Sequence, residues 1–204
     1  MEREAEVIRT TREYFDSNAK DYDNSPDGRF VRCMYREIVD RAAAKNPTSV
    51  LDVGCGNGNI LMQLLETGAA LYGLDLSPNM IAEAELRLGE RASLTVGDAE
   101  HLPYEDHSFD LVICNASFHH YPHPDAVLGE IRRVLKPRGT FILGDPTAPA
   151  PVRALLNLSF RGKGAGDFKI YGKKEIYRML AARGFVVENW RRLNYRTFIT
   201  VART

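Results

Sequence analysis

The sequence has no apolar run approaching the roughly 20 residues that a helix needs to cross a bilayer. It also shows no secretory signal, because residues 1–12 are charged and lack the apolar core that such a signal requires. These absences argue against a membrane-spanning or secreted protein. We therefore expect a cytoplasmic protein.

Cysteine is scarce. Cys33, Cys55 and Cys114 are the three cysteines, an odd number, and they lie far apart in the chain. This spacing suggests neither a disulfide framework nor a CxxC metal-binding motif. A reducing compartment such as the cytoplasm fits this pattern.

Net charge is also absent, since 27 Lys and Arg residues balance 27 Asp and Glu residues. Non-specific nucleic-acid binding needs a positive field that displaces counterions, and the chain as a whole provides none. A local basic patch remains compatible with the balance. The default expectation is a small-molecule or protein partner, not a nucleic acid.

A regular alternation of short apolar strands and amphipathic helices is present from Pro47 onward. A chain of 204 residues is long enough for one such domain with its own core. Before Pro47, apolar residues recur at helical spacing over residues 30–42, and the Asn46-Pro47 pair is predicted to end that helix. The expected strands are residues 49–53, 71–74, 94–96, 109–114 and 140–143.

Residues typical of helix ends indicate where the helices between these strands begin and stop. Gly68 is suited to a left-handed helix stop, and Ser77-Pro78 reads as an N-cap followed by proline at the first helical position. Pro137 is expected to stop an amphipathic helix over residues 127–135. Gly184 is expected to end a helix around residues 176–180.

The C-terminal part departs from this alternation. Residues 185–187 and 195–202 read as two strands joined by a stretch too short for the crossover helix that parallel neighbours require, so they should pair antiparallel. The predicted fold is α/β. It is a doubly wound, Rossmann-like, seven-stranded and mostly parallel sheet with an antiparallel last strand.

The most informative segment is the glycine loop LDVGCGNG, residues 51–58, which follows a strand and opens a helix. Gly54 and Gly56 match the start of the dinucleotide fingerprint GxGxxG, but Asn59 occupies its third glycine position. Asp52, two residues before Gly54, would repel a pyrophosphate and attract an ammonium or sulfonium group. S-adenosylmethionine carries both cations, so it is favoured over NAD.

Three further strand ends carry polar groups. Asp75 ends the second strand, where a carboxylate can accept hydrogen bonds from both ribose hydroxyls; alternatively, it is a helix-start acid near Ser77. We expect the ligand role, because Ser77 can cap the helix unaided. Asp98, after the third strand, is suited to an adenine edge or to a simple turn. Asn115 ends the fourth strand, at the crevice where chemistry usually takes place.

Four ordered segments carry a family resemblance: VLDVGCGNG, LDLSPNM, GDAEHLPYEDHSFDLVICNASFHHYPHP and LKPRGTFIL. Together they resemble the class I S-adenosylmethionine-dependent methyltransferases, and within them the branch with ubiquinone/menaquinone methyltransferases and many small-molecule enzymes. The resemblance is close over residues 14–143. One departure is Arg138, where the family often has a second glycine; this is a turn position, so little functional effect is expected.

The resemblance implies roles for individual residues. Asp52, Gly54 and Gly56 would hold the methionine part of the cofactor, and Asp75 the ribose. The other residues that the resemblance places at the cofactor are Tyr14, Tyr22, Leu76, Met80, Asp98, Ala99 and Asn115. The implied division is an N-terminal helical cap over residues 1–46, a cofactor-binding core over 47–145, and an acceptor-side cover with C-terminal strands over 146–204. These parts make up one domain.

His119, His120 and His123 follow the fourth strand, near the expected methyl group. His119 or His120 could act as a general base, although the paired histidine is common in the family with unrelated acceptors, which favours a structural role. Methyl transfer from a sulfonium needs alignment more than acid catalysis, so no base is obligatory. We expect no metal site, because no cysteine or well-placed carboxylate completes the set.

Two segments beyond the fifth strand could cover an acceptor. Residues 152–160 are apolar enough for a short helix lining the pocket or covering the core. Residues 161–174 carry five basic residues and one acid, so they predict either a solvated loop or a lid over an anionic or polar acceptor.

The predicted function is methyl transfer from S-adenosylmethionine to a small molecule, with S-adenosylhomocysteine as product. A non-catalytic cofactor-binding partner or sensor, an RNA or protein methyltransferase, and a dinucleotide oxidoreductase are the alternatives.

Overall fold

The computed structural model describes residues 2–160 and 166–204 of the chain. In this described part, the strands form one seven-stranded sheet in the order β3-β2-β1-β4-β5-β7-β6. The strands are β1 (Ser49–Val53), β2 (Ala70–Asp75), β3 (Ser93–Val96), β4 (Phe109–Asn115), β5 (Leu135–Pro146), β6 (Val186–Arg192) and β7 (Thr197–Arg203). The five strands β1 to β5 are parallel, whereas β7 pairs antiparallel with both β5 and β6. The predicted fold class is confirmed.

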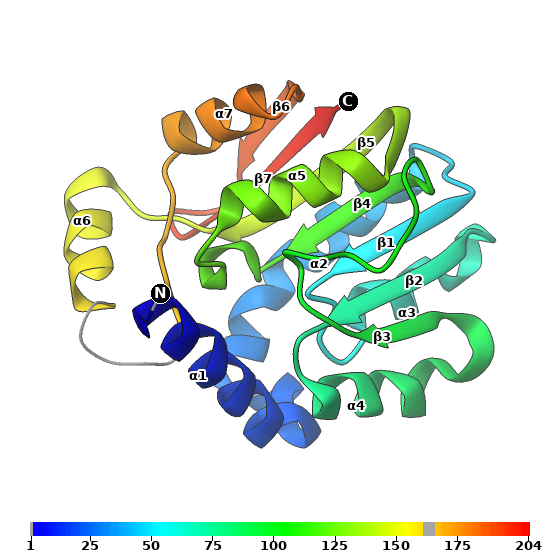
Figure 1. Ribbon diagram of the computed structural model, residues 1–204, viewed down its shortest axis with the longest axis horizontal. Coiled ribbons are helices and arrows are strands. Elements are labelled where there is room, and N and C mark those ends of the chain that lie inside the picture. Colours follow the sequence, from blue (N-terminus) through cyan, green and yellow to red (C-terminus); the bar gives the residue numbers. More distant parts are fainter. Residues whose placement is uncertain (1, 161–165) are drawn as a thin grey trace.

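Helices cover both faces of the sheet, as the alternation predicted (Figure 1). The α-helices are α1 (Glu2–Asn18), α2 (Pro26–Ala43), α3 (Asn59–Leu64), α4 (Pro78–Leu88), α5 (Pro124–Val134), α6 (Ala150–Ser159) and α7 (Lys173–Ala182). Short 3₁₀ turns are η1 (Ala19–Asn24), η2 (Leu65–Thr67), η3 (Gly89–Arg91) and η4 (Phe118–His120).

Strand side chains alternate between two apolar clusters, one on each face. Leu51 and Val53 of β1 join the cluster that packs on α5 and α7. Val50 of the same strand joins the opposite cluster, which packs on α2, α3 and α4. Asp52 therefore points to the same face as Val50, although it is an acidic residue between the buried apolar residues Leu51 and Val53.

The predicted helix ends at Gly68 and Gly184 are confirmed, whereas the one predicted at Pro137 is wrong. Gly68 and Gly184 have left-handed backbones with φ of 74° and 76°, and the Ser77 side chain caps α4 by accepting from the Met80 N–H. Pro137 does not stop a helix. It lies inside β5, because α5 already ends at Val134 and the next residue pairs with β4.

Two acidic residues tie the N-terminal helices to the sheet layer. Asp16 of α1 accepts hydrogen bonds from the Ser77 hydroxyl at 2.5 Å and from the Asn79 N–H at 3.2 Å. Asp23 of η1 accepts from the side chains of Asn57, in the glycine loop, and Asn59, the first residue of α3. The carboxyl ends of β1, β2 and β4 point toward α1, so this N-terminal cap lies over the strand ends (Figure 1).

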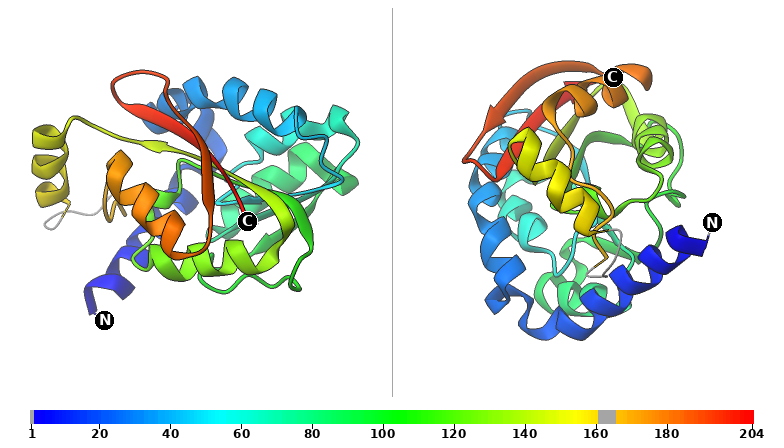
Figure 2. Two further views of the ribbon diagram at one scale, coloured as in Figure 1. Left: turned by 90° about the horizontal axis from the view of Figure 1, so that it is seen from above. Right: turned by 90° about the vertical axis from the view of Figure 1, so that its left-hand side faces the viewer.

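The helix predicted over residues 152–160 forms as α6, but it does not cover the core. Figure 1 and the left view of Figure 2 show α6 projecting from one end of the molecule. Its Leu155 and Leu158 side chains are 73% and 61% exposed. Among the described residues, no helix combines the length and the apolarity that crossing a membrane demands.

Candidate functional site

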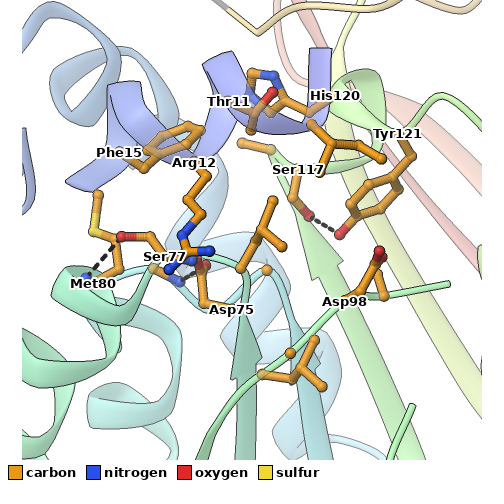
Figure 3. Close-up of a pocket in the computed structure, with 18 of the residues that line it drawn as sticks. Thr11, Arg12, Phe15, Asp75, Ser77, Met80, Asp98, Ser117, His120 and Tyr121 are labelled. Atoms are coloured by element: carbon orange, nitrogen blue, oxygen red, sulfur yellow. Dashed lines mark hydrogen bonds between the residues drawn. The ribbon is translucent and has the colours of Figure 1, made fainter. Parts of the chain in front are cut away.

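A cleft opens at the carboxyl ends of β1, β2 and β4, beneath α1, and is named here the glycine-loop cleft (Figure 3). The chain runs from β1 through β2 to β3 toward one edge of the sheet, and after returning it runs from β4 to β5 toward the other, so the cleft lies at the topological switch point between β1 and β4. Ligands of doubly wound folds bind at this place. Its lining includes the predicted residues Tyr22, Gly54, Gly56, Asp75, Leu76, Met80, Asp98, Ala99 and Asn115.

The glycine loop leaves the floor of this cleft open. Gly54 and Gly56 have φ of 75° and 53°, in the left-handed region that favours glycine. A Cβ on Gly56 would meet no atom within 4 Å, so it would project into open space, whereas a Cβ on Gly54 would collide with the Ser117 side chain. Gly54 is therefore needed for packing, and Gly56 leaves space where a ligand can approach the backbone.

Asp52 lies in a deep recess behind the loop, the Asp52 recess, which Tyr22, Tyr35 and Asn115 also line. The side chain is almost fully buried, and its Oδ1 has no hydrogen-bond partner within the described part of the chain. Burial, with a smaller contribution from the Asp75 carboxylate, raises the pKa of Asp52 to about 8. An unpartnered buried carboxylate is costly, so it marks a place where a cation is expected.

Asp75 has a structural role in addition to its place at the cleft. Its Oδ2 accepts the Gly56 N–H at 2.8 Å and its Oδ1 accepts the Ser77 N–H at 2.9 Å. Burial raises the pKa of Asp75, and these N–H donors oppose that rise. The Ser77 contact matches the alternative of a helix-start acid, whereas the Gly56 contact was not predicted. The carboxylate joins the glycine loop to the start of α4 while it faces the cleft.

The far end of the cleft combines apolar side chains with the Asp98 carboxylate. Met80 and Ala99 are buried there, and Leu76 lies beside them. Asp98 faces the cleft in Figure 3, and its Oδ1 accepts the Glu100 N–H at 2.9 Å, which leaves its Oδ2 available for a donor. This combination suits a flat heteroaromatic ring that carries an amino group.

One helix face of α1 contributes four residues that the sequence reasoning missed: Ile8, Thr11, Arg12 and Phe15. They recur at i, i+3, i+4 and i+7, the spacing of a single helical face, and this was the available signal. Arg12 points into the cleft in Figure 3. The cleft volume is about 90 Å³, below the roughly 300–1,000 Å³ of small-molecule sites, so a nucleoside requires these side chains to move.

Tyr14 is the one predicted cofactor residue that does not line the glycine-loop cleft or the Asp52 recess. Its hydroxyl donates to Asp27 at 2.5 Å, and its ring lines a second hollow, named here the outer cavity, of about 690 Å³. Phe15, Tyr22 and His120 line both the glycine-loop cleft and the outer cavity. The two spaces therefore meet at an aromatic boundary, where the Phe15 and Tyr22 rings lie 6.0 Å apart.

The paired histidines lie at this boundary in different environments. Nδ1 of His119 lies 2.9 Å from Oδ1 of the fully buried Asp145. Burial disfavours the charged ring, but the Asp145 carboxylate outweighs this and raises the pKa of His119. Burial and the neighbouring His119 lower the pKa of His120, whose Nδ1 lies 3.0 Å from the Gly166 carbonyl oxygen.

The reason given for expecting no metal site was wrong. Asp167 Oδ1 lies 3.5 Å from both His119 Nε2 and His120 Nδ1, and Asp145 lies behind His119. These carboxylates are 25 or more positions away from His119 and His120 in the sequence, and the fold brings them together. His123 is not part of this cluster, and its Nε2 lies 4.0 Å from Oε2 of Glu4.

The structure describes residues 166–174 of the basic segment that spans residues 161–174. Residues 161–165 lie outside the described residues. Asp167 and Ile170 line the outer cavity, and Lys169 pairs with Glu175 at 2.8 Å. Whether the segment acts as a lid stays a prediction.

Comparison with known proteins agrees with this geometry. A family model described as "Methyltransferase domain" matches residues 51–143. The chain is 31% identical over 193 residues to a malonyl-[acyl-carrier protein] O-methyltransferase of Geobacter sulfurreducens, covering 87% of this chain and 70% of that protein. It is 34% identical over 132 residues to a demethylmenaquinone methyltransferase of Thermus thermophilus, covering 62% of this chain and 59% of that protein.

A solved structure shows the same fold over nearly the whole chain. The 1,6-didemethyltoxoflavin-N1-methyltransferase of Burkholderia thailandensis, which carries its substrate and S-adenosylhomocysteine, superposes with a TM-score of 0.77. The match has 21% sequence identity and covers 98% of this chain and 90% of that one. The chain belongs to the class I S-adenosylmethionine-dependent methyltransferase family, whose methyl donor is S-adenosylmethionine.

Several relatives are much longer than this chain. It spans 36% of a sterol 4-C-methyltransferase of Caenorhabditis elegans and 42% of a Streptomyces halstedii methyltransferase that it matches. Sequence identity to these relatives therefore supports a methyltransferase domain in this chain. The acceptor must be inferred from the chain's own cavity.

Proposed function

We propose that this protein transfers the methyl group of S-adenosylmethionine to a small acceptor molecule in the outer cavity. The observation that carries the proposal is the Asp52 carboxylate, which is buried and unpartnered at Oδ1 beside the open floor at Gly56. The α-ammonium group of S-adenosylmethionine is the cation that such a carboxylate would receive. A pyrophosphate placed there would meet an acid instead of donors.

The remaining parts of the cofactor find matching groups along the cleft. The methionine chain would pass Gly54 and Gly56, and the ribose hydroxyls would donate to Asp75, which is half-buried and faces the same space. The adenine would lie among the apolar residues at the far end, with its amino group toward Asp98. The backbone of Asn115, which lines both the cleft and the Asp52 recess, would lie under the sulfonium.

The methyl group would cross at the aromatic boundary. The faces of the Phe15 and Tyr22 rings attract a sulfonium as cation–π partners. The thioether is a good leaving group, so the protein chiefly has to align donor and acceptor and exclude water. His119 and His120 stand at this boundary, and a base role for either stays a prediction.

The outer cavity supports a compact, largely apolar acceptor. Its volume of about 690 Å³ is within the range of drug-sized ligands. Aromatic, proline and aliphatic side chains make up most of its lining. Its charged residues are Asp27, Asp167 and Arg196, so carboxylates outnumber the guanidinium, and Arg196 already stacks over the Phe30 ring. This favours a neutral or cationic acceptor over the anionic one suggested by residues 161–174, unless another cation offsets the acids.

We extend the proposal to the organisation of the whole chain. Residues 1–46 act as the cofactor cap, 47–145 as the cofactor-binding core and 146–204 as the acceptor-side cover. The three dispersed cysteines support a reducing compartment such as the cytoplasm.

Two measurements test the proposal. Titration calorimetry should show binding of S-adenosylmethionine and S-adenosylhomocysteine and no binding of NAD. Tighter binding of NAD than of S-adenosylhomocysteine would contradict the proposed function. Release of S-adenosylhomocysteine should then be followed with metabolite pools fractionated by charge, and the neutral and cationic pools are expected to support turnover. Cofactor binding without turnover in every pool would indicate a non-catalytic binding protein.

A further inference from the structure

Four titratable side chains gather where the outer cavity meets the glycine-loop cleft. They come from three parts of the chain: His119 and His120 from η4, Asp145 from the end of β5, and Asp167 from the segment after α6. The two histidines and Asp145 are buried or nearly so, whereas the Asp167 side chain is 28% exposed. Methyl transfer as proposed above uses neither carboxylate.

The distances within the cluster are those of ligands around a shared ion. Asp167 Oδ1 lies 3.5 Å from His119 Nε2 and 3.5 Å from His120 Nδ1, and one ligand atom from each of the three residues lies within 4.8 Å of the others. A separation of 3.5 Å exceeds the roughly 2.7–3.2 Å of an N–H···O hydrogen bond. Bonds of about 2.0–2.2 Å at tetrahedral angles place neighbouring ligand atoms about 3.4 Å apart.

Asp145 supplies the outer partner that histidine ligands generally have. Its Oδ1 lies 2.9 Å from Nδ1 of His119, which fixes the tautomer with the proton on Nδ1 and the lone pair on Nε2. Nε2 is the atom that faces Asp167. A carboxylate–histidine pair behind a ligand atom is the usual outer arrangement of a metal site.

We propose that His119 Nε2, His120 Nδ1 and the Asp167 carboxylate bind one divalent transition-metal ion at the boundary of the outer cavity. His120 would exchange its hydrogen bond to the Gly166 carbonyl oxygen for the metal bond, and its ring proton would move from Nδ1 to Nε2. Because His119, His120 and Asp167 all line the outer cavity, the remaining coordination position opens into it. Two imidazoles with one carboxylate suit zinc or iron(II) rather than calcium or magnesium.

The site would also define the acceptor further, and this step rests on the proposed methyl transfer. A divalent ion would offset the carboxylates of the outer cavity. An acceptor with an oxygen or nitrogen ligand, such as a hydroxyl or carbonyl group, could then be held next to the aromatic boundary. The metal site itself does not depend on that activity, so binding of the metal alone tests it.

The experiment titrates Zn²⁺ into the full-length chain after chelator treatment and dialysis. We expect one equivalent to bind with micromolar or tighter affinity. Asp167→Asn and His119→Gln should each weaken binding by more than the roughly 10–100-fold that loss of an outer partner costs. His123→Gln is the matched control, since this exposed histidine lies in the same loop outside the cluster, and its affinity should equal that of the unmodified protein.

A second pair of measurements separates a metal site from a purely structural cluster. Asp145→Asn should keep one equivalent of Zn²⁺ but lower its affinity roughly 10–100-fold. Co²⁺ should give visible d–d absorption with the unmodified protein and none with Asp167→Asn, whose partly exposed side chain can change without unfolding the chain. Thermal unfolding and S-adenosylhomocysteine titration of the same samples check the fold and the cofactor site. The proposal is overturned if the unmodified protein binds no Zn²⁺, or if Asp167→Asn and His123→Gln bind it equally.

Discussion

The N–H of Gly56 donates a hydrogen bond of 2.8 Å to Oδ2 of Asp75, which links the glycine loop to the end of the neighbouring strand. The other carboxylate oxygen of Asp75 accepts the N–H of Ser77, at the start of α4. A single side chain therefore fixes two backbone segments that border the cleft. The shape of the cofactor site and the stability of the empty protein are coupled through this residue.

Replacing Asp75 should affect both properties. Asp75→Ala removes the acceptor of two ribose hydroxyls, each charge-assisted bond being worth about 1.5–3 kcal/mol, so affinity for S-adenosylhomocysteine should fall roughly ten- to a hundredfold or more. It also leaves two backbone donors unpaired, so the ligand-free protein should unfold at lower temperature. Asp75→Asn should be less destabilising, since one oxygen is kept. Calorimetry and thermal unfolding measure the two effects; unchanged affinity with lower stability would make Asp75 a structural residue alone.

A methyl group at Gly56 should block the cofactor without disrupting the core. The new Cβ would project into open space, at a left-handed φ of 53° that costs a non-glycine residue about 1–2 kcal/mol. Gly68→Ala is the matched control, since Gly68 has φ of 74°, equally open surroundings and a place outside the cleft. Both variants should lose similar stability. Only Gly56→Ala should lose affinity for S-adenosylhomocysteine, and equal affinities in the two variants would remove the loop from the site.

Asp52→Asn should stabilise the ligand-free protein at neutral and alkaline pH. The folded pKa of Asp52, about 8, lies above the ordinary value of 3.8, so the folded state holds a proton that the unfolded chain releases. Stability contributed by this group therefore falls as pH rises from about 4 to about 8. Asparagine cannot ionise, so the variant lacks this loss. Unfolding temperatures at pH 4 and pH 8 should show a gain at pH 8 that shrinks at pH 4; an equal gain at both would contradict the raised pKa.

The same pKa predicts how cofactor binding depends on pH. Below pH 8 most empty protein carries a protonated Asp52, whereas the ligand ammonium binds the ionised form. Affinity for S-adenosylhomocysteine should thus rise toward about tenfold per pH unit between pH 6 and 8, level off once Asp52 is ionised in the empty protein, and fall as the ligand's own amino group loses its proton. Calorimetry in buffers of different ionisation enthalpy should detect release of about one proton at pH 6.5. Asp52→Asn should bind weakly with no proton release.

The sheet and most of the cleft could be predicted because their signals are local. Strand runs, the glycine loop and the Ser77-Pro78 cap each specify backbone geometry within a few residues, and parallel strands bring their carboxyl ends to one edge. The bounds of β5 were less predictable. Pro137 suggested a helix stop, but pairing of Leu135 with Phe109 of β4 had already begun the strand.

The site features that the sequence did not predict depend on contacts between segments that are distant in the chain. Asp145 and Asp167 reach the histidines only because β5 and the segment after α6 return to η4, and no spacing in the sequence encodes that. The second role of Asp75 likewise depends on Gly56, 19 residues earlier, turning its N–H toward the strand end. Tyr14 and Tyr22 both line the outer cavity, yet only Tyr22, which follows the kink in η1, also lines the glycine-loop cleft.

This difference gives the two tyrosines opposite expected phenotypes. Tyr22 lines the glycine-loop cleft, the Asp52 recess and the outer cavity, whereas Tyr14 lines only the outer cavity among these three and donates to Asp27. S-adenosylmethionine has a sulfonium and S-adenosylhomocysteine a neutral thioether, so an aromatic ring beside the sulfur should favour the former. A cation–π contact is worth about 0.5–2 kcal/mol, equivalent to roughly 2- to 30-fold in affinity.

Tyr22→Leu should therefore weaken S-adenosylmethionine more than S-adenosylhomocysteine, changing the ratio of their dissociation constants by roughly 2- to 30-fold. Tyr14→Leu should leave that ratio unchanged, because its ring does not reach the cleft, although acceptor turnover should decline as the wall of the outer cavity changes. The ratio is the informative readout, since general loosening of the N-terminal cap would weaken both ligands equally. A shifted ratio in Tyr14→Leu, with none in Tyr22→Leu, would reverse the assignment of the two rings.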